Sequence, residues 1–433
     1  MKLNWFSPLP PAKTGIAEFT AGLLPTLSSR ADITLWTDQS DWDSTLEQHC
    51  VVRQFTPAEI DWTIVNDADV TFYNLGNNHL FHASIWQVSR LHPGVVILHD
   101  VSLHNFFDSL YNGVWRDTSG YLDQMEAHYG LEGRRAASEF VNRTVSIEAL
   151  AERYPLTQLA LENSIGAIVH SPSAFEELSR LNQIATVYVP LPAVFGPRFD
   201  LADLPSRSDD PPYNLILFGH LGRNRRLDSV FEALEPFHQK HLFHLHIYGA
   251  SDDSKQLRQR IRSLNLSDVV TLHGYATENH LDAALKKAHL AINLRYPTMG
   301  EASASQLRIW SYSLPSLVTQ VGWYSSLPEA TVAHVRPDHE VEDIQLHLTN
   351  FLAARETFER MGRSGHAALM KYHNPEDYVR TVLDLAKNCR QLHLHAVAKR
   401  LAERGGNLIA PWTVDPLTDS LRMARQILSL TSH

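Results

Sequence analysis

Residues 300–305 combine the residue types that a site for a phosphate and a polyol needs. Glu301 ends a loop, and only small residues follow it, namely Ala302, Ser303, Ala304 and Ser305. Free N–H groups at the start of a helix bind phosphate, and small side chains let the anion come close. A carboxylate such as that of Glu301 accepts hydrogen bonds from sugar or ribose hydroxyls. The stretch therefore predicts the outline of a nucleotide-sugar site.

Three arginines point to the same chemistry in another segment. Arg223, Arg225 and Arg226 cluster after Gly219 and His220, just before a predicted helix. Guanidinium groups match phosphate oxygens bidentately. A solvated basic helix start is the alternative, but cations there oppose the helix dipole. We therefore favour an anionic ligand for this cluster.

Two further candidates follow strands near the N-terminus. Gly15 precedes a helix, where it could let the backbone approach a diphosphate or could serve an ordinary turn. His99 and Asp100 end a strand, and the His99 imidazole could bind a sugar hydroxyl or help to position an acceptor. A polar strand end satisfied by its neighbours remains the alternative, and it is stronger for His104.

The elements that must position these residues alternate between strand and helix. Such alternation predicts parallel, doubly wound sheets of the α/β class. A proline-rich stretch, 190–212, interrupts the pattern and predicts a linker. We expect one domain over 1–193, a second over 213–373, and a helical tail over 374–433 that in part crosses back to the first. The strands expected are 2–6, 33–36, 51–55, 70–73, 95–99, 167–170, 186–189, 215–218, 243–248, 269–273, 290–294, 316–319 and 332–335.

Every functional candidate follows a strand. Ligands of open α/β sheets bind at the carboxyl ends of the strands. Two such domains would face each other across a cleft, and the candidates would line it.

Composition narrows the range of partners. The chain has 433 residues and a net charge of −10, which argues against nonspecific binding to nucleic acid. Its two cysteines, Cys50 and Cys389, suit reduced structural thiols better than a disulfide scaffold or a zinc site. We find no signal peptide and no membrane span. A cytoplasmic protein is expected, with possible peripheral contact at the inner face of the membrane.

Several enzyme classes lack their sequence motifs here. The chain has no P-loop, no G-x-G-x-x-G after the first strand and no G-x-S-x-G elbow. His244 and His246 alternate with apolar residues on a predicted strand, and no third ligand is evident nearby. We therefore favour a structural role for them over a metal site.

These motifs, taken in order, resemble the family 4 glycosyltransferases of the GT-B fold over roughly residues 1–390. The resemblance is carried by PLPPAKTGIA from residue 8, HD at 99–100, GRNRRL from residue 222, and PTMGEASAS from residue 297 running on to SLPSLVTQVGWY. It implies a retaining, metal-independent transferase of nucleotide-activated hexoses with no cofactor. A saccharide or lipid-linked saccharide acceptor, in polysaccharide or glycolipid synthesis, is implied by analogy.

The resemblance also implies roles for individual residues. Gly15 would contact the donor diphosphate, His99 would lie near the donor sugar, and Glu301 would bind that sugar. Gly219 begins the phosphate-binding segment. We assign catalysis to His99, Glu301 and Arg225, and the acceptor side to Asp100 and His104. The predicted donor-binding residues are Gly15, Gly219, His220, Arg225, Tyr275, Glu301, Ala302, Ser303, Ala304, Ser305 and Arg308.

Three positions depart from the family pattern. Arg225 stands where a lysine is usual, and His220 stands where another basic residue is usual. Arg308 stands where most members carry a second glutamate that contacts ribose, so Arg308 would contact phosphate or base instead. This departure keeps two alternatives open: a nucleotide-sugar epimerase or hydrolase on the same fold, and a degenerate member that binds a partner glycosyltransferase.

Overall fold

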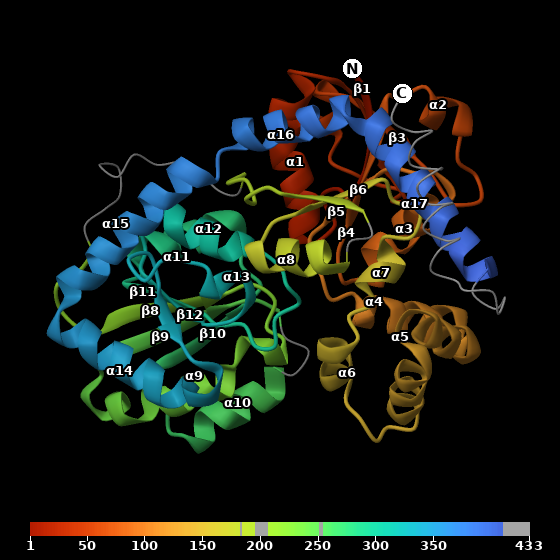
Figure 1. Ribbon diagram of the computed structural model, residues 1–433. Coiled ribbons are helices and arrows are strands. Elements are labelled where there is room, and N and C mark those ends of the chain that lie inside the picture. The colour runs from red at the N-terminus through yellow and green to blue at the C-terminus, as the bar shows by residue number, and fades with distance from the viewer. Residues whose placement is uncertain (182–183, 195–206, 251–253, 410–433) are drawn as a thin grey trace. The chain divides into compact units, whose positions relative to one another are not determined.

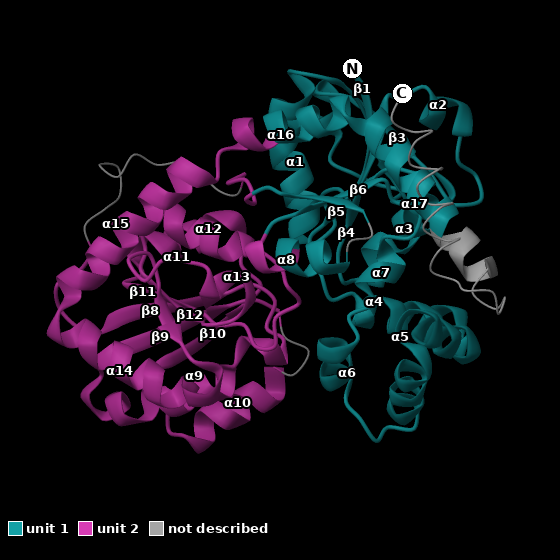
Figure 2. Ribbon diagram, in the orientation of Figure 1, with its two compact units in different colours: residues 1–170, 175–189, 379–433 teal, residues 171–174, 190–378 magenta. Residues whose placement is uncertain are grey.

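A computed structural model describes residues 1–181, 184–194, 207–250 and 254–409, which form two compact units. Figure 2 shows the units in different colours. Unit 1 contains Met1–His170, Phe175–Val189 and the described residues from Val379 onward, and unit 2 contains Ser171–Ala174 and Pro190–Tyr378. Within the predicted linker, residues 195–206 lie outside the described part of the chain.

Unit 1 is built on a seven-stranded parallel sheet in the order β3-β2-β1-β4-β5-β6-β7. The central strand β4 is buried along its whole length. A parallel sheet needs helices on both faces, so its inner strands are continuously apolar. The strands are β1 Lys2–Phe6, β2 Asp32–Thr37, β3 Val51–Gln54, β4 Val70–Leu75, β5 Val95–Leu98, β6 Gly166–Val169 and β7 Ala185–Tyr188.

The helices of unit 1 lie around this sheet and in a separate cluster made by α4 to α7 (Figure 1). The cluster includes a π-helical turn, Ser109–Trp115, and a kink in α5 at Gly130, where φ is +68°. The helices are α1 Gly15–Ser28, α2 Trp62–Asn66, α3 His79–Leu91, α4 His104–Asp108, α5 Thr118–Val141, α6 Ile147–Arg153, α7 Thr157–Ala160 and α8 Pro172–Leu181, whose first residues fall in unit 2.

Unit 2 is built on a six-stranded parallel sheet in the order β10-β9-β8-β11-β12-β13. The strands are β8 Tyr213–Phe218, β9 Phe243–Tyr248, β10 Val270–Gly274, β11 Leu290–Asn293, β12 Ser316–Thr319 and β13 Ala333–Val335. The helices are α9 Leu227–Leu234, α10 Ser254–Ser263, α11 Glu278–Lys287, α12 Ala304–Ser311, α13 Gly322–Ser325, α14 Glu340–Ala353 and α15 Arg355–Tyr372. β8 and β11 are neighbours, so the loops that follow them meet at one edge of the sheet.

Two helices make up the described C-terminal region. Asn374 caps α16 (Pro375–Lys387) by accepting a hydrogen bond from the Glu376 N–H at 3.0 Å. α17 (Cys389–Ile409) belongs to unit 1, where Arg400 donates to Asn163 at 2.6 Å. The predicted α/β class with two doubly wound sheets and a helical C-terminal region is confirmed, and each predicted strand is present to within two residues. None of the helices in the described residues has the length and hydropathy needed to span a membrane.

Candidate functional site

The loop between β8 and α9 buries Arg225 instead of exposing it. Arg225 is 2% exposed, and its guanidinium donates to the Phe218 and His220 carbonyls at 3.0 and 3.2 Å. Gly219 makes this possible, because its φ is +106° and an added Cβ would lie 2.6 Å from Arg225 Nη2. Sequence analysis favoured an anionic ligand for the cluster that includes this arginine, and the structure places Arg225 inside the loop that it shapes.

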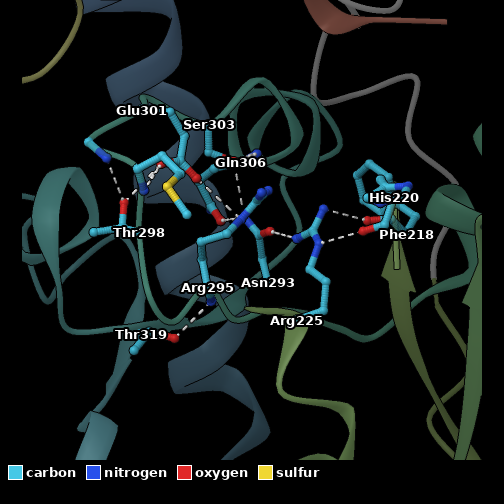
Figure 3. Close-up of polar contacts among 12 residues, drawn as sticks. Phe218, His220, Arg225, Asn293, Arg295, Thr298, Glu301, Ser303, Gln306 and Thr319 are labelled. Carbon is cyan, nitrogen blue, oxygen red and sulfur yellow. Dashed lines mark hydrogen bonds and ion pairs between the residues drawn. The ribbon is translucent and has the colours of Figure 1, made fainter. Parts of the chain in front are cut away.

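An amide connects Arg225 to the start of α12. Asn293, the last residue of β11, accepts from Arg225 Nη1 at 2.8 Å and donates to Gln306 Oε1 at 3.0 Å. Ser303 caps α12 by accepting from the Gln306 N–H at 3.1 Å. The arginine and the first turn of α12 are thus fixed to one another, as Figure 3 shows. A site of this kind is preorganised for an anion, since guanidinium and helix amides both donate to phosphate.

Glu301 lies in the loop between β11 and α12 and is held by that loop. Its Oε2 accepts from the Thr298 hydroxyl at 2.9 Å and from the Met299 N–H at 2.7 Å. Its Oε1 faces Arg295 Nε at 3.4 Å. The side chain is 14% exposed, so one carboxylate edge is fixed and the other lies beside a cation.

The site carries an excess of positive charge. Burial, together with the like charge of Arg295, lowers the pKa of Arg225 to about 9. The groups bonded to Arg225 are carbonyls and an amide, which carry no compensating charge. A buried cation in such surroundings favours an anionic ligand.

His220, Tyr275 and Arg308 are the other predicted donor-binding residues of unit 2. His220 is exposed next to Gly219, and Tyr275 is 69% exposed at the end of β10. Tyr275 lines a hollow of about 500 Å³ on the face of β8, β9 and β10. Arg308 points towards α11, where Glu278 and Asp282 each lie 2.6 Å from its Nη2. Two carboxylates already surround Arg308, so this geometry does not favour the predicted contact with phosphate.

Among the unit 1 candidates, His99 forms a hydrogen-bonded pair with Asn74. His99 Nε2 lies 3.0 Å from Asn74 Oδ1, while the Asn74 amide nitrogen donates to the Phe6 carbonyl. Asn74 must therefore accept from His99, which assigns the proton to Nε2 and leaves Nδ1 as an acceptor. Burial, with His170 and His82 nearby, lowers the pKa of His99 well below its usual value. At neutral pH the His99 imidazole is therefore uncharged, and its Nδ1 can accept a hydrogen bond from a hydroxyl group.

Asp100 has a structural role within unit 1, whereas no packing constraint requires glycine at position 15. Asp100 Oδ2 accepts from the Asn77 N–H at 2.7 Å, so Asp100 holds the loop that follows β4. A Cβ added to Gly15 would meet no heavy atom within 4 Å. Nothing in the packing of unit 1 demands glycine there, and this leaves the first turn of α1 open to a close ligand.

His104 lies in the core. It is fully buried, and its two ring nitrogens contact the Tyr154 carbonyl at 2.5 Å and the Tyr121 hydroxyl at 2.6 Å. These contacts join α4, α5 and the end of α6. His104 therefore has a packing role instead of the surface position that an acceptor contact requires.

The histidines of β9 also have protein partners. His244 contacts Thr271 at 2.8 Å, and His246 contacts His273 at 3.1 Å and Asn214 at 3.3 Å. Within the described ranges, no group of three or more His, Cys, Asp or Glu side chains is arranged to hold a metal ion. The two histidines are thus hydrogen-bonded to residues of the neighbouring strands β8 and β10.

Comparison with known proteins identifies the segment that carries the charged site. Residues 203–367 match the family model described as glycosyl transferases group 1. The matched segment contains Gly219, Arg225 and Glu301, and the predicted GT-B fold is confirmed. Comparison with curated proteins gave no match.

Solved structures share the fold over about 90% of the chain. Sucrose-phosphate synthase (tll1590) from Thermosynechococcus elongatus is 15% identical, with a TM-score of 0.60, over 90% of this chain and 98% of that one. Anabaena Alr3699/HepE, solved with UDP and glucose, is 15% identical, with a TM-score of 0.59, over 90% and 100%. WaaG, a glycosyltransferase involved in lipopolysaccharide biosynthesis, is 14% identical, with a TM-score of 0.54, over 88% and 98%.

Sequence reasoning missed the residues that connect the site. Asn293, Gln306, Arg295 and Asn74 all bond to a predicted site residue or lie beside one. Asn293 ends β11, whose other residues are apolar, and Asn74 is the next-to-last residue of β4, which is buried along its whole length. A buried amide at that position must be bonded, which is the signal that could have indicated both.

Proposed function

We propose that this chain is a retaining glycosyltransferase that moves a hexose from a nucleoside diphosphate sugar to a hydroxyl group of an acceptor. The observation that carries the proposal is the buried Arg225, fixed through Asn293 to the first turn of α12. Preorganised donors of this kind stabilise charge that develops on a leaving diphosphate. Glu301, two residues before the cap of α12, is suited to sugar hydroxyls.

We propose the following roles in the reaction. The acceptor oxygen bonds to the anomeric carbon as the bond from that carbon to the diphosphate oxygen breaks. Attack on the face that the diphosphate leaves retains configuration, and a phosphate oxygen takes the acceptor proton. Arg225, the Gly219 segment and the amides that follow Ser303 hold the diphosphate, and no metal is needed because they supply the positive charge. Gly15 and His99 are proposed to contact the same donor, His99 through Nδ1.

The acceptor is proposed to be a saccharide or a lipid-linked saccharide. We propose that the reaction takes place in the cytoplasm, with at most peripheral membrane contact. Two free thiols, Cys50 and Cys389, agree with a reducing compartment.

The test is incubation with a panel of nucleotide sugars and detection of the released nucleoside diphosphate, with and without a chelator. UDP-glucose comes first in the panel, because a structural neighbour was solved in complex with it. Release that depends on a saccharide acceptor supports transfer, and the anomeric configuration of the product tests retention. Release of free sugar, or formation of an epimer, without an acceptor would support the epimerase or hydrolase alternative.

The second alternative, a degenerate partner subunit, has one observation in its favour. Arg308 is paired with Glu278 and Asp282, so α12 offers no carboxylate at that position. Absence of binding to every nucleotide and nucleotide sugar in calorimetry would favour this alternative.

A further inference from the structure

Two guanidinium groups and one carboxylate lie close together in the site of unit 2, and the carboxylate contacts only one of them, Arg295. Arg225 is 2% exposed, and the side chains of Arg295 and Glu301 are 22% and 14% exposed. Figure 3 shows Arg225 and Arg295 projecting from neighbouring loops, with Asn293 between them. The three charges sum to +1 in a partly desolvated space.

The backbone fixes where Arg295 lies. Arg295 comes two residues after the end of β11, and its N–H donates to Thr319 Oγ1 at the end of β12 at 2.9 Å. This bond holds the residue at the carboxyl edge of the sheet, where Gly219 and Arg225 also lie. Arg295 therefore sits beside the proposed diphosphate position and was not among the predicted site residues.

The two carboxylate oxygens of Glu301 are held differently. Oε2 of Glu301 is bonded to Thr298 and Met299 at 2.9 and 2.7 Å, but Oε1 is 3.4 Å from Arg295 Nε. Hydrogen bonds between a guanidinium and a carboxylate are usually about 2.7–2.9 Å long. Arg295 can therefore leave Oε1 without disturbing the bonds that place Glu301.

We infer that Arg295 is a second cation for the donor diphosphate and that it exchanges partners when the donor binds. In the unliganded protein Arg295 faces Glu301. When a diphosphate enters, the guanidinium turns to its oxygens, and Oε1 of Glu301 becomes available to a hydroxyl of the sugar. Binding of the phosphate thereby prepares the sugar contact. The inference rests on the proposed function, because it assumes that the anion is a donor diphosphate.

An alternative role for Arg295 makes different predictions. If Arg295 only neutralises and positions Glu301, its removal alters sugar recognition and leaves the affinity for a bare diphosphate unchanged. The partner exchange instead predicts that Arg295 contributes directly to that affinity. It also predicts that Glu301 competes with the diphosphate for Arg295.

The experiment measures the binding of UDP and of inorganic pyrophosphate by calorimetry. It measures transfer by the release of nucleoside diphosphate. Arg295→Gln is expected to lower the affinity for UDP and for pyrophosphate by about ten- to hundredfold, since a charged hydrogen bond is lost. Arg295→Lys is expected to recover part of the loss. Glu301→Gln is expected to tighten UDP by severalfold while it lowers transfer, and this gain is expected to vanish in the Arg295→Gln background.

Two results would overturn the inference: UDP affinity of Arg295→Gln within twofold of the wild type, or equal tightening by Glu301→Gln with and without Arg295. Arg360→Gln, an exposed arginine on α15, is the matched control and should bind and react like the wild type. Wild-type protein that releases no diphosphate from any nucleotide sugar would reject the proposed function and the inference together. An active wild type with an unaffected Arg295→Gln would reject the inference alone.

Discussion

The polar site of each unit lies at the carboxyl edge of that unit's own sheet, but the two sites differ in charge. In unit 1, His99 and Asn74 form a neutral pair, and burial keeps the histidines uncharged. In unit 2, Arg225 keeps its charge in the interior, and its hydrogen-bond partners among the described residues are carbonyls and an amide. A neutral site can orient hydroxyls, and a charged site can hold a leaving phosphate. The contrast suggests that binding geometry and charge stabilisation are divided between the units.

The largest effect should come from removing the buried cation. Arg225→Met is expected to reduce transfer by about 10³-fold or more, since one preorganised donor contributes about 10²–10³-fold and Arg225 supplies several. Diphosphate release would measure the loss. Arg225→Lys should retain part of the activity.

A folding defect must be separated from this loss, because Met leaves the Phe218 and His220 carbonyls without their donor. Thermal unfolding of both variants provides that control. Full activity in a folded Arg225→Met would remove the basis for assigning charge stabilisation to unit 2.

A pair of glycine substitutions compares the two units directly. Gly219→Ala is expected to cost about 1–3 kcal/mol of stability, because φ is +106° there, and to lower transfer by displacing Arg225. Gly15→Ala should leave the melting temperature unchanged, because its Cβ would meet nothing in the chain. It should still weaken UDP binding by about tenfold if a diphosphate approaches that backbone. Equal behaviour of the two variants in unfolding and calorimetry would contradict the contrast.

The sequence determined the fold more fully than the site. Strand positions followed from short apolar runs such as that of β11 and from alternation such as that of β9, because burial imposes these patterns locally. Gly219, Arg225 and Glu301 were recognisable because their types and spacing are chemical signals. The direction of each side chain was not recognisable, since it depends on distant partners. Arg308 pairs with α11, His104 packs between helices, and Arg295 faces Glu301.

Arg308 tests whether every buried arginine of unit 2 belongs to the charged site. Arg308→Met is expected to cost about 1–3 kcal/mol of stability, because Asp282 loses a partner at a partly buried position. The affinity for UDP should change by less than about threefold. Chemical denaturation and calorimetry measure the two effects. A large loss of UDP affinity without a loss of stability would restore the predicted donor contact and extend the charged site to α12.

The last prediction concerns the buried, uncharged histidines of unit 1 and their effect on the pH dependence of stability. Burial lowers the pKa of His82 to about 4, which is below its unfolded value. The unfolded chain therefore takes up a proton as the pH falls below about 6.5, while the folded chain does not, and stability falls with it. His82→Asn should reduce this dependence between pH 6 and 4.5 by about 1.4 kcal/mol per pH unit. Denaturation at several pH values measures how stability changes with pH. His280→Asn, at an exposed position of α11, is the control. An unchanged slope in His82→Asn would mean that His82 is charged in the folded protein, and the neutral description of unit 1 would fail.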